Sequence, residues 1–272
     1  MLSHEFARNA LIAGSAVAIA SGVIGYFLVL RAQVFAGDAL SHVAFTGTLA
    51  AALAGIDLRL GLFAATVAVG LLFAPVGERT GGDDVAIGVV FAWTLGVGVL
   101  FLDLFNRRSG GSNGVIASRT LFGSIFSLTG TQTGIAVIVA AGLVVGMAVI
   151  GRPLLFATVS GTTAAARGVR AGLVGAAFLG LVGVDAGEAT QAVGALLLLG
   201  LLAVPAGAAV RLSATPVVGI SLSAAFGLAS VWLGLTLAYL VSSVPPSSAI
   251  VGVAVALYAA SMAIAAVRRR TA

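Results

Sequence analysis

The chain has 272 residues, of which 60% are hydrophobic and only 8% are charged. No soluble fold keeps that much apolar surface away from water, so most of the surface must face lipid. The formal charge of +5 does not indicate nucleic-acid binding. The arginines that carry it stand singly or in small groups at the ends of apolar runs, as in the cytoplasmic loops of membrane proteins.

Two residue types are absent from the sequence, and each absence excludes a class of site. Without cysteine the chain has no disulfide, thiolate metal site or thiol nucleophile. Without lysine it has no phosphate-binding loop of the kind that ends in Lys-Ser or Lys-Thr. No Ser/His/Asp or paired-carboxylate arrangement for hydrolysis is visible. The chain is therefore predicted not to be an enzyme, and any ATP hydrolysis is expected on a separate chain.

Successive apolar runs are long enough to cross a hydrocarbon core, which takes roughly 20 helical residues. The sequence thus predicts an all-α integral membrane protein, a polytopic bundle of about eight or nine transmembrane helices. It forms a single domain over residues 1–272. The first run is longer than the apolar core of a signal peptide, so we expect a retained helix. The sixth run is short and also fits as a partial span. The runs are residues 10–30, 36–56, 58–76, 85–104, 134–150, 169–184, 189–210, 217–241 and 250–267.

Two connections between the runs are longer than a turn. In residues 105–133 a polar stretch precedes Arg119–Leu128, whose apolar and small residues predict an interfacial or partly inserted helix. Residues 151–170 are polar enough to leave the membrane and rich enough in alanine to form a short helix. A surface helix between two spans is what a soluble motor protein would push on. Pro205 is expected to bend the seventh run.

The arginines also predict an orientation. With the first residue outside the cell, nine arginines lie on the cytoplasmic side and five lie outside. That is the direction of bias found in the loops of membrane proteins. The C-terminal run Arg268–Arg270 is the strongest local signal, and we expect it in the cytoplasm.

Ionisable side chains are costly inside apolar spans and therefore mark candidate functional sites. The best candidates are Asp38 and His42, four residues apart near the start of the second run. On a helix this spacing projects both side chains from one face, about one turn apart, where they can coordinate one cation together. If the helix begins near Gln33, His42 lies well inside the bilayer. Ser41 is a candidate hydrogen-bonding partner for a ligand.

Spacing alone leaves a second interpretation open, in which Asp38 and His42 bond to each other or to a neighbouring helix and only stabilise the bundle. If they bind a metal, imidazole and carboxylate without thiolate fit zinc, manganese or ferrous iron. Calcium or magnesium would require an all-oxygen shell. The other histidine, His4, precedes the first run and is expected in solvent.

The remaining acids are expected at solvated helix ends. Asp83 and Asp84 belong to a polar loop before the fourth run, and Asp103 lies near the far end of that run. Asp185 and Glu188 are expected to flank a short external turn. Each of these groups could also face a docking protein or draw in cations.

The segment at residues 37–47 resembles the membrane subunit of manganese/zinc/iron ABC importers, a family in which Gly-Asp-x-x-Ser-His opens the second span. Four further stretches match that family in the same order, and together the matches cover most of the chain. The five stretches are GDALSHVAFTG (37–47), DDVAIGVVFAWTLGVGVLF (83–101), RTLFGSIFSLT (119–129), QAVGALLLLGLLAVPAGAAVRL (191–212) and PSSAIVGVAVALYAAS (246–261).

The resemblance implies a multi-pass permease of the bacterial plasma (inner) membrane, paired with a second permease copy as a homodimer or as a related pair. Two cytoplasmic ATPase subunits and an extracytoplasmic metal-binding protein are the implied partners, besides membrane lipid and without nucleic acid. By resemblance, Asp38 and His42 correspond to the metal ligands of the channel, and residues 154–169 to the cytoplasmic coupling segment. No cofactor is expected to be bound permanently. Manganese, zinc or iron is the expected cargo.

Two segments depart from the family pattern. Residues 159–162, Val-Ser-Gly-Thr, stand where an acidic stretch is usual in the coupling segment, which bears on the choice of ATPase partner. Residues 91–93, Phe-Ala-Trp, stand in the fourth span where some zinc-type members carry a histidine. The second departure favours manganese or iron.

The main hypothesis is therefore the channel subunit of an ATP-driven importer for divalent transition metal ions. An ATP-independent secondary transporter or channel is the alternative. Neighbouring genes for an ATPase with a phosphate-binding loop and for a secreted metal-binding lipoprotein would distinguish the two. A membrane scaffold without transport activity is disfavoured, because it has no use for Asp38 and His42 inside lipid.

Overall fold

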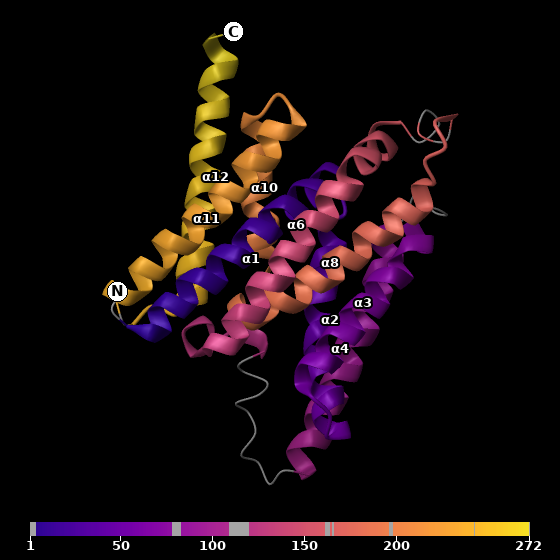
Figure 1. Cartoon of the computed structure of the whole chain (residues 1–272), viewed down its shortest axis with the longest axis vertical. Helices are drawn as coiled ribbons and strands as arrows, with labels where there is room; N and C mark the ends of the chain where they lie inside the picture. The colour runs from indigo at the N-terminus through magenta and orange to yellow at the C-terminus, as the bar shows by residue number, and fades with distance from the viewer. Residues whose placement is uncertain are drawn as a thin grey trace.

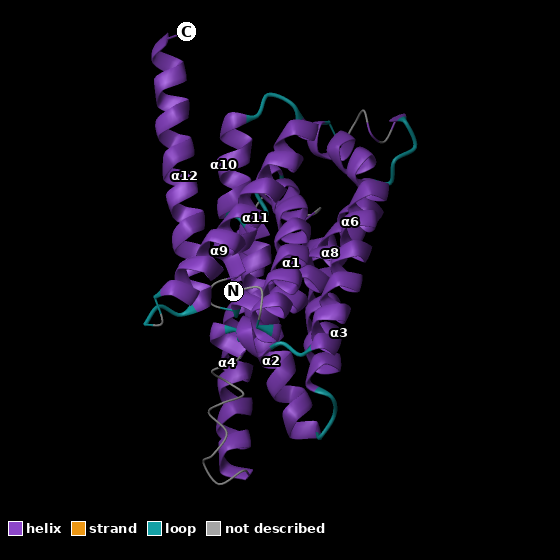
Figure 2. Ribbon diagram, turned by 60° about the vertical axis from the view of Figure 1, so that its left-hand side comes forward, coloured by secondary structure: helices purple, strands orange, loops and turns teal. Residues whose placement is uncertain are grey.

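The computed structural model describes residues 4–77, 83–108, 120–160, 164, 166–195, 198–241 and 243–271, with side chains except at 75–77, 83–84 and 268–271. Over these residues the chain is helical and contains no strand (Figure 2). Six of the described helices are long and apolar enough to cross a membrane. The expected all-α polytopic membrane fold is confirmed.

The helices begin and end close to the predicted runs. Most runs correspond to one helix, whereas the region after residue 193 is divided into two short helices. The helices are α1 (Glu5–Leu30), α2 (Val34–Ala54), α3 (Leu58–Gly77), α4 (Asp83–Arg108), α6 (Gly130–Val159), α8 (Ala171–Val193), α9 (Leu198–Leu202), α10 (Val204–Leu212), α11 (Pro216–Leu240) and α12 (Pro246–Thr271), with a 3-10 turn η1 (Ile125–Ser127).

The bundle has a centre and two flanks (Figure 1). In the centre α1, α6 and α8 pack against one another. On one flank α2 packs against both α3 and α4, and on the other α10, α11 and α12 pack together. In Figure 1 the C-terminal end of α12 lies at the top of the view, and the N-terminal end of α1 lies at the left, about half-way down.

Glycines let the backbones of α3 and α8 approach closely. A Cβ atom on Gly183 of α8 would lie 2.5 Å from the carbonyl oxygen of Thr66 in α3. A Cβ atom on Gly70 of α3 would likewise lie 2.5 Å from the carbonyl oxygen of Leu179 in α8. In lipid, where helices gain little from hydrophobic association, such close packing is a principal source of bundle stability.

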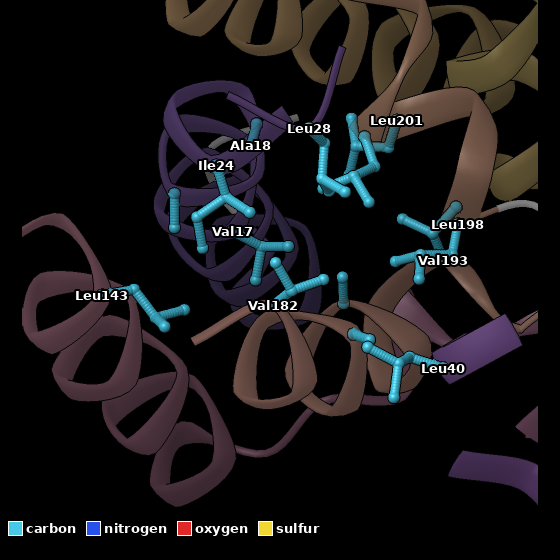
Figure 3. Close-up of a cluster of buried hydrophobic side chains, with 14 of the residues drawn as sticks. Val17, Ala18, Ile24, Leu28, Leu40, Leu143, Val182, Val193, Leu198 and Leu201 are labelled. Atoms are coloured by element: carbon cyan, nitrogen blue, oxygen red, sulfur yellow. The ribbon is translucent and has the colours of Figure 1, made fainter. Parts of the chain in front are cut away.

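The main hydrophobic core lies inside the centre of the bundle (Figure 3). Val17 of α1 and Val182 of α8 meet there, close to Leu143 of α6. Leu40 of α2 and Leu198 of α9 complete the cluster, and both are fully buried. One face of α2 is therefore held against the core, and this fixes where its other face points.

Three local expectations require correction. The seventh run, 189–210, is not continuous, because α8 extends to Val193 and a new helix starts at Leu198. The break at Ala203, just before Pro205, agrees with the expected bend. Arg119–Leu128 was expected to be an interfacial or partly inserted helix, but its described residues do not form one continuous helix: residues 120–122 are helical, the 3-10 turn η1 follows after a break, and Ile125 is buried in the bundle. In addition, α6 continues without a break to Val159, so its last turns include residues 154–159 of the expected coupling segment.

Candidate metal centre

Helix α2 presents Asp38 and His42 on one side. The helix begins at Val34 after Gln33, as expected, so Asp38 lies in its second turn and His42 one turn further. Both side chains are half-buried, whereas Leu40 on the other side is fully buried in the core. The two candidate ligands therefore face away from the centre of this subunit.

The imidazole of His42 is held by α4. Its ring contacts Phe91 edge-on, with 5.0 Å between the ring centroids. One turn further along α2, the Thr46 hydroxyl donates a 2.9 Å hydrogen bond to the carbonyl oxygen of Thr94, which fixes the register of the two helices. His42 Nδ1 is buried and has no hydrogen-bond partner among the described residues. This nitrogen is thus not engaged by the described residues and remains available to coordinate a metal.

Asp38 and His42 are close enough for the carboxylate charge to act on the imidazole. Ser41 does not support either side chain, because its hydroxyl donates a 2.7 Å hydrogen bond to the backbone carbonyl of Asp38. No third His, Cys, Asp or Glu joins the pair within the described part of the chain. His4 is exposed at the start of α1. The described residues of one subunit therefore offer a metal two ligands at this place.

The other acids divide into solvated and buried groups. Asp103 is 53% exposed and forms a 2.9 Å ion pair with Arg107, as expected of a solvated helix end. The side chains of Asp83 and Asp84 lie outside the described residues.

For Asp185 and Glu188 the sequence prediction is wrong. They do not flank an external turn but lie inside α8, with 1% and 4% of their surface exposed. Gly187 lies between them. Its small size makes room for Leu62 and Phe63 of α3, since a Cβ there would lie within 3.0 Å of both side chains.

Arg31 connects the start of α2 to the end of α6. Its Nε donates a 2.9 Å hydrogen bond to Gln33, and its Nη1 donates a 3.1 Å hydrogen bond to Thr158. The guanidinium also lies over the ring of Phe178 in α8, 5.9 Å from the centroid. Burial lowers the pKa of Arg31. Arg31 thus links the start of α2, which carries the candidate ligands, to the end of α6, which residues 160–169 follow.

Comparison with known proteins identifies relatives over nearly the whole chain. A sequence profile described as the ABC 3 transport family matches residues 3–265. The manganese transport system membrane protein MntC of Halalkalibacterium halodurans is 29% identical over 262 residues, covering 95% of this chain and 87% of that protein. The manganese import system permease protein ScaB of Streptococcus parasanguinis is 27% identical over 241 residues, covering 86% and 82%. Among solved structures, PsaBC from Streptococcus pneumoniae in complex with Fab matches with a TM-score of 0.83 and 27% identity, covering 96% of this chain and 92% of that chain.

Proposed function

This chain belongs to the ABC 3 transport family, and from that premise we propose that it is the channel subunit of an ATP-driven importer for a divalent transition metal. The observation that carries the proposal is the pair on α2, a half-buried carboxylate beside an imidazole whose buried nitrogen has no partner among the described residues. A passing dication would supply the countercharge for Asp38 and the missing contact of His42.

Manganese is the first candidate for the cargo. Relatives over most of the chain are named for manganese transport or import. In addition, the group that lies against His42 is the apolar ring of Phe91 and not a further nitrogen ligand. Zinc sites commonly gather three or four nitrogen or sulfur ligands, whereas manganese accepts carboxylate and water. Ferrous iron is compatible with the same donors and is the next candidate.

The half-exposed position of Asp38 and His42 supports a paired permease. Two ligands leave most of a metal's coordination shell to water or to another chain. A second copy placed against this face of α2 would add another pair and enclose the path. The complete importer would then contain two permease copies in the bacterial inner membrane, two cytoplasmic ATPase subunits and an extracytoplasmic metal-binding protein.

Residues 160–169 are proposed as the contact with the ATPase. They follow directly on α6, whose Thr158 accepts a hydrogen bond from Arg31 in the turn before α2. A force on this segment would therefore reach the start of the helix that carries Asp38 and His42. The link gives a physical route from ATP hydrolysis to the metal site.

The first experiment tests whether ATP is hydrolysed by this chain or by a separate ATPase subunit. We expect the purified chain alone to hydrolyse none, because it contains no lysine and hence no phosphate-binding loop. Cells that lack their own importer should accumulate manganese when the chain is produced with its ATPase and binding protein, measured by ICP-MS. Omitting the ATPase should remove the accumulation. Uptake at the full level without any ATPase would support the alternative, a secondary transporter.

The orientation is tested by labelling single cysteines, for which the cysteine-free chain needs no prior substitutions. Ser160→Cys should react with an impermeant maleimide only in inside-out vesicles. Ile56→Cys, exposed in the turn between α2 and α3, should react only in intact cells and serves as the control. Labelling of Ser160→Cys in intact cells would refute a cytoplasmic coupling segment.

A further inference from the structure

Besides Asp38 and His42, the bundle contains a pair of buried carboxylates. Asp185 and Glu188 are three residues apart on α8 and so project from neighbouring positions of one helix face. Their exposed fractions are only 1% and 4%. Asp185 lies eight residues before the end of α8 at Val193, which is about 12 Å along the helix axis. Both acids therefore lie within a helix that is long and apolar enough to cross a membrane.

Each acid has one carboxylate oxygen without a hydrogen-bond partner among the described residues. Asp185 Oδ1 accepts a 3.0 Å hydrogen bond from the Ser21 hydroxyl of α1. Asp185 Oδ2 and Glu188 Oε2 are buried and have no hydrogen-bond partner among the described residues. On the inner side the next turn of α8 carries Val182, which packs with Val17 in the apolar core (Figure 3). Any group that satisfies the acids must come from the other direction.

A cavity of about 330 Å³ lies at the end of α8, where Thr190 and Gln191 line it but Asp185 and Glu188 do not. Arg59 and Gln191 both line it, and Arg59 Nε donates a 2.7 Å hydrogen bond to Gln191 Oε1. Gln191 follows Glu188 by three residues, one helical turn. Fully buried Thr190 also lines the cavity, and its hydroxyl has no partner among the described residues. The same is true of Arg59 Nη2 and Gln191 Nε2. The cavity has room to hold water next to these residues.

The charges around the acids do not cancel. Arg59 is the cation whose charge acts on Glu188, and Glu188 acts on Asp185. Asp57 is exposed and caps α3, with Oδ1 accepting hydrogen bonds from the backbone amides of Arg59 at 2.8 Å and Leu60 at 3.3 Å. Ser21 of α1, which donates a hydrogen bond to Asp185, carries no charge. Two ionised carboxylates and one guanidinium would leave a net charge of −1 inside the membrane, where an uncompensated charge is costly.

We propose that Asp185 and Glu188 form a proton-binding site that holds one proton, taken up from the side of the cavity. One carboxylate oxygen forms an O–H bond with a proton from a hydronium ion, which is left as water, and the cluster with Arg59 becomes neutral. A metal ion fits less well, because the positive charge of Arg59, which acts on Glu188, repels a dication. In the orientation given above, the cavity opens on the extracytoplasmic side. The site does not depend on Asp38 or His42, so its test stands apart from that of the metal centre.

The charge balance gives a direct spectroscopic test on the purified full chain. At neutral pH the infrared spectrum should contain the carbonyl band of a protonated carboxyl group. Asp185→Asn and Glu188→Gln should each remove the band, because the remaining acid then balances Arg59 without a proton. Arg59→Gln should increase it, since the pair must then hold two protons. Asp103→Asn, which changes a solvated acid, should leave it unaltered. A band that persists in both acid variants, or none in the wild type, would overturn the proposal.

Stability provides the second readout. The folded chain retains a proton that the unfolded chain releases, so raising the pH from about 5 to about 8 should lower the unfolding temperature of the wild type. Glu188→Gln, the nearly isosteric change, should flatten this dependence, and it serves alone if Asp185→Asn does not fold. Manganese binding is measured in parallel by equilibrium dialysis. Binding that survives Asp38→Ala but is lost in Glu188→Gln would assign the pair to a metal and not to a proton.

Discussion

Asp38→Ala is expected to abolish manganese accumulation while the protein still reaches the membrane. The carboxylate is the only formal negative charge of the candidate metal pair on α2, and no salt bridge to it exists among the described residues. Removing it also relieves a desolvation cost of at least ~2.5 kcal/mol on insertion scales, so the fold should be unaffected or slightly stabilised. Replacing a group that only hydrogen-bonds to a metal ligand typically lowers metal affinity or activity roughly 10–100-fold. Replacing Asp38, which is proposed to bind the metal directly, should lower uptake by at least as much.

His42→Ala is the companion change. It should impair uptake as well, and by a larger factor for zinc than for manganese, because zinc favours nitrogen ligands more strongly. Metal accumulation is measured by ICP-MS in cells without their own importer, at matched membrane abundance of each variant. Asp103→Ala, an exposed acid on α4, is the control and should transport normally. Wild-type accumulation by both Asp38→Ala and His42→Ala would mean that the pair is structural.

Gly183→Val is expected to have the largest effect on stability. A Cβ atom at this position would lie 2.5 Å from the carbonyl oxygen of Thr66. Gly70 packs equally closely against Leu179, so α3 and α8 would have to give up this second close contact to make room. Extra atoms in a packed interior cost about 1–3 kcal/mol, and here the clash is with backbone, which cannot change rotamer. The variant should lose most of its folded population.

The control for this change is Gly142→Val on α6, where an added Cβ meets nothing within 4 Å. Both variants are compared by membrane abundance and by thermal unfolding in detergent. Gly142→Val should behave like the wild type. Equal unfolding temperatures for Gly183→Val and the wild type would show that α3 and α8 do not approach as closely as described.

Local patterns were sufficient for much of this protein. Apolar runs of membrane-spanning length predict the helices because a backbone in lipid must satisfy its own hydrogen bonds within each helix. The start of α2 after Gln33 and the common side of Asp38 and His42 also follow from local spacing, since a helix places residues four apart on one face. Whether these two side chains bind metal is not a local property, and the proposal awaits the uptake experiment.

Burial was decided only in the tertiary structure. The stretch Asp185-Ala-Gly-Glu188 has the composition of an external turn, yet it lies within α8. The group that bonds Asp185 is Ser21, 164 residues away in the sequence, and the charge that acts on Glu188 belongs to Arg59 on another helix. No local pattern contains those partners. An acid can remain in a helix inside the bundle when distant residues supply hydrogen bonds and countercharge, so its depth depends on the packing of whole helices and not on its neighbours in the chain.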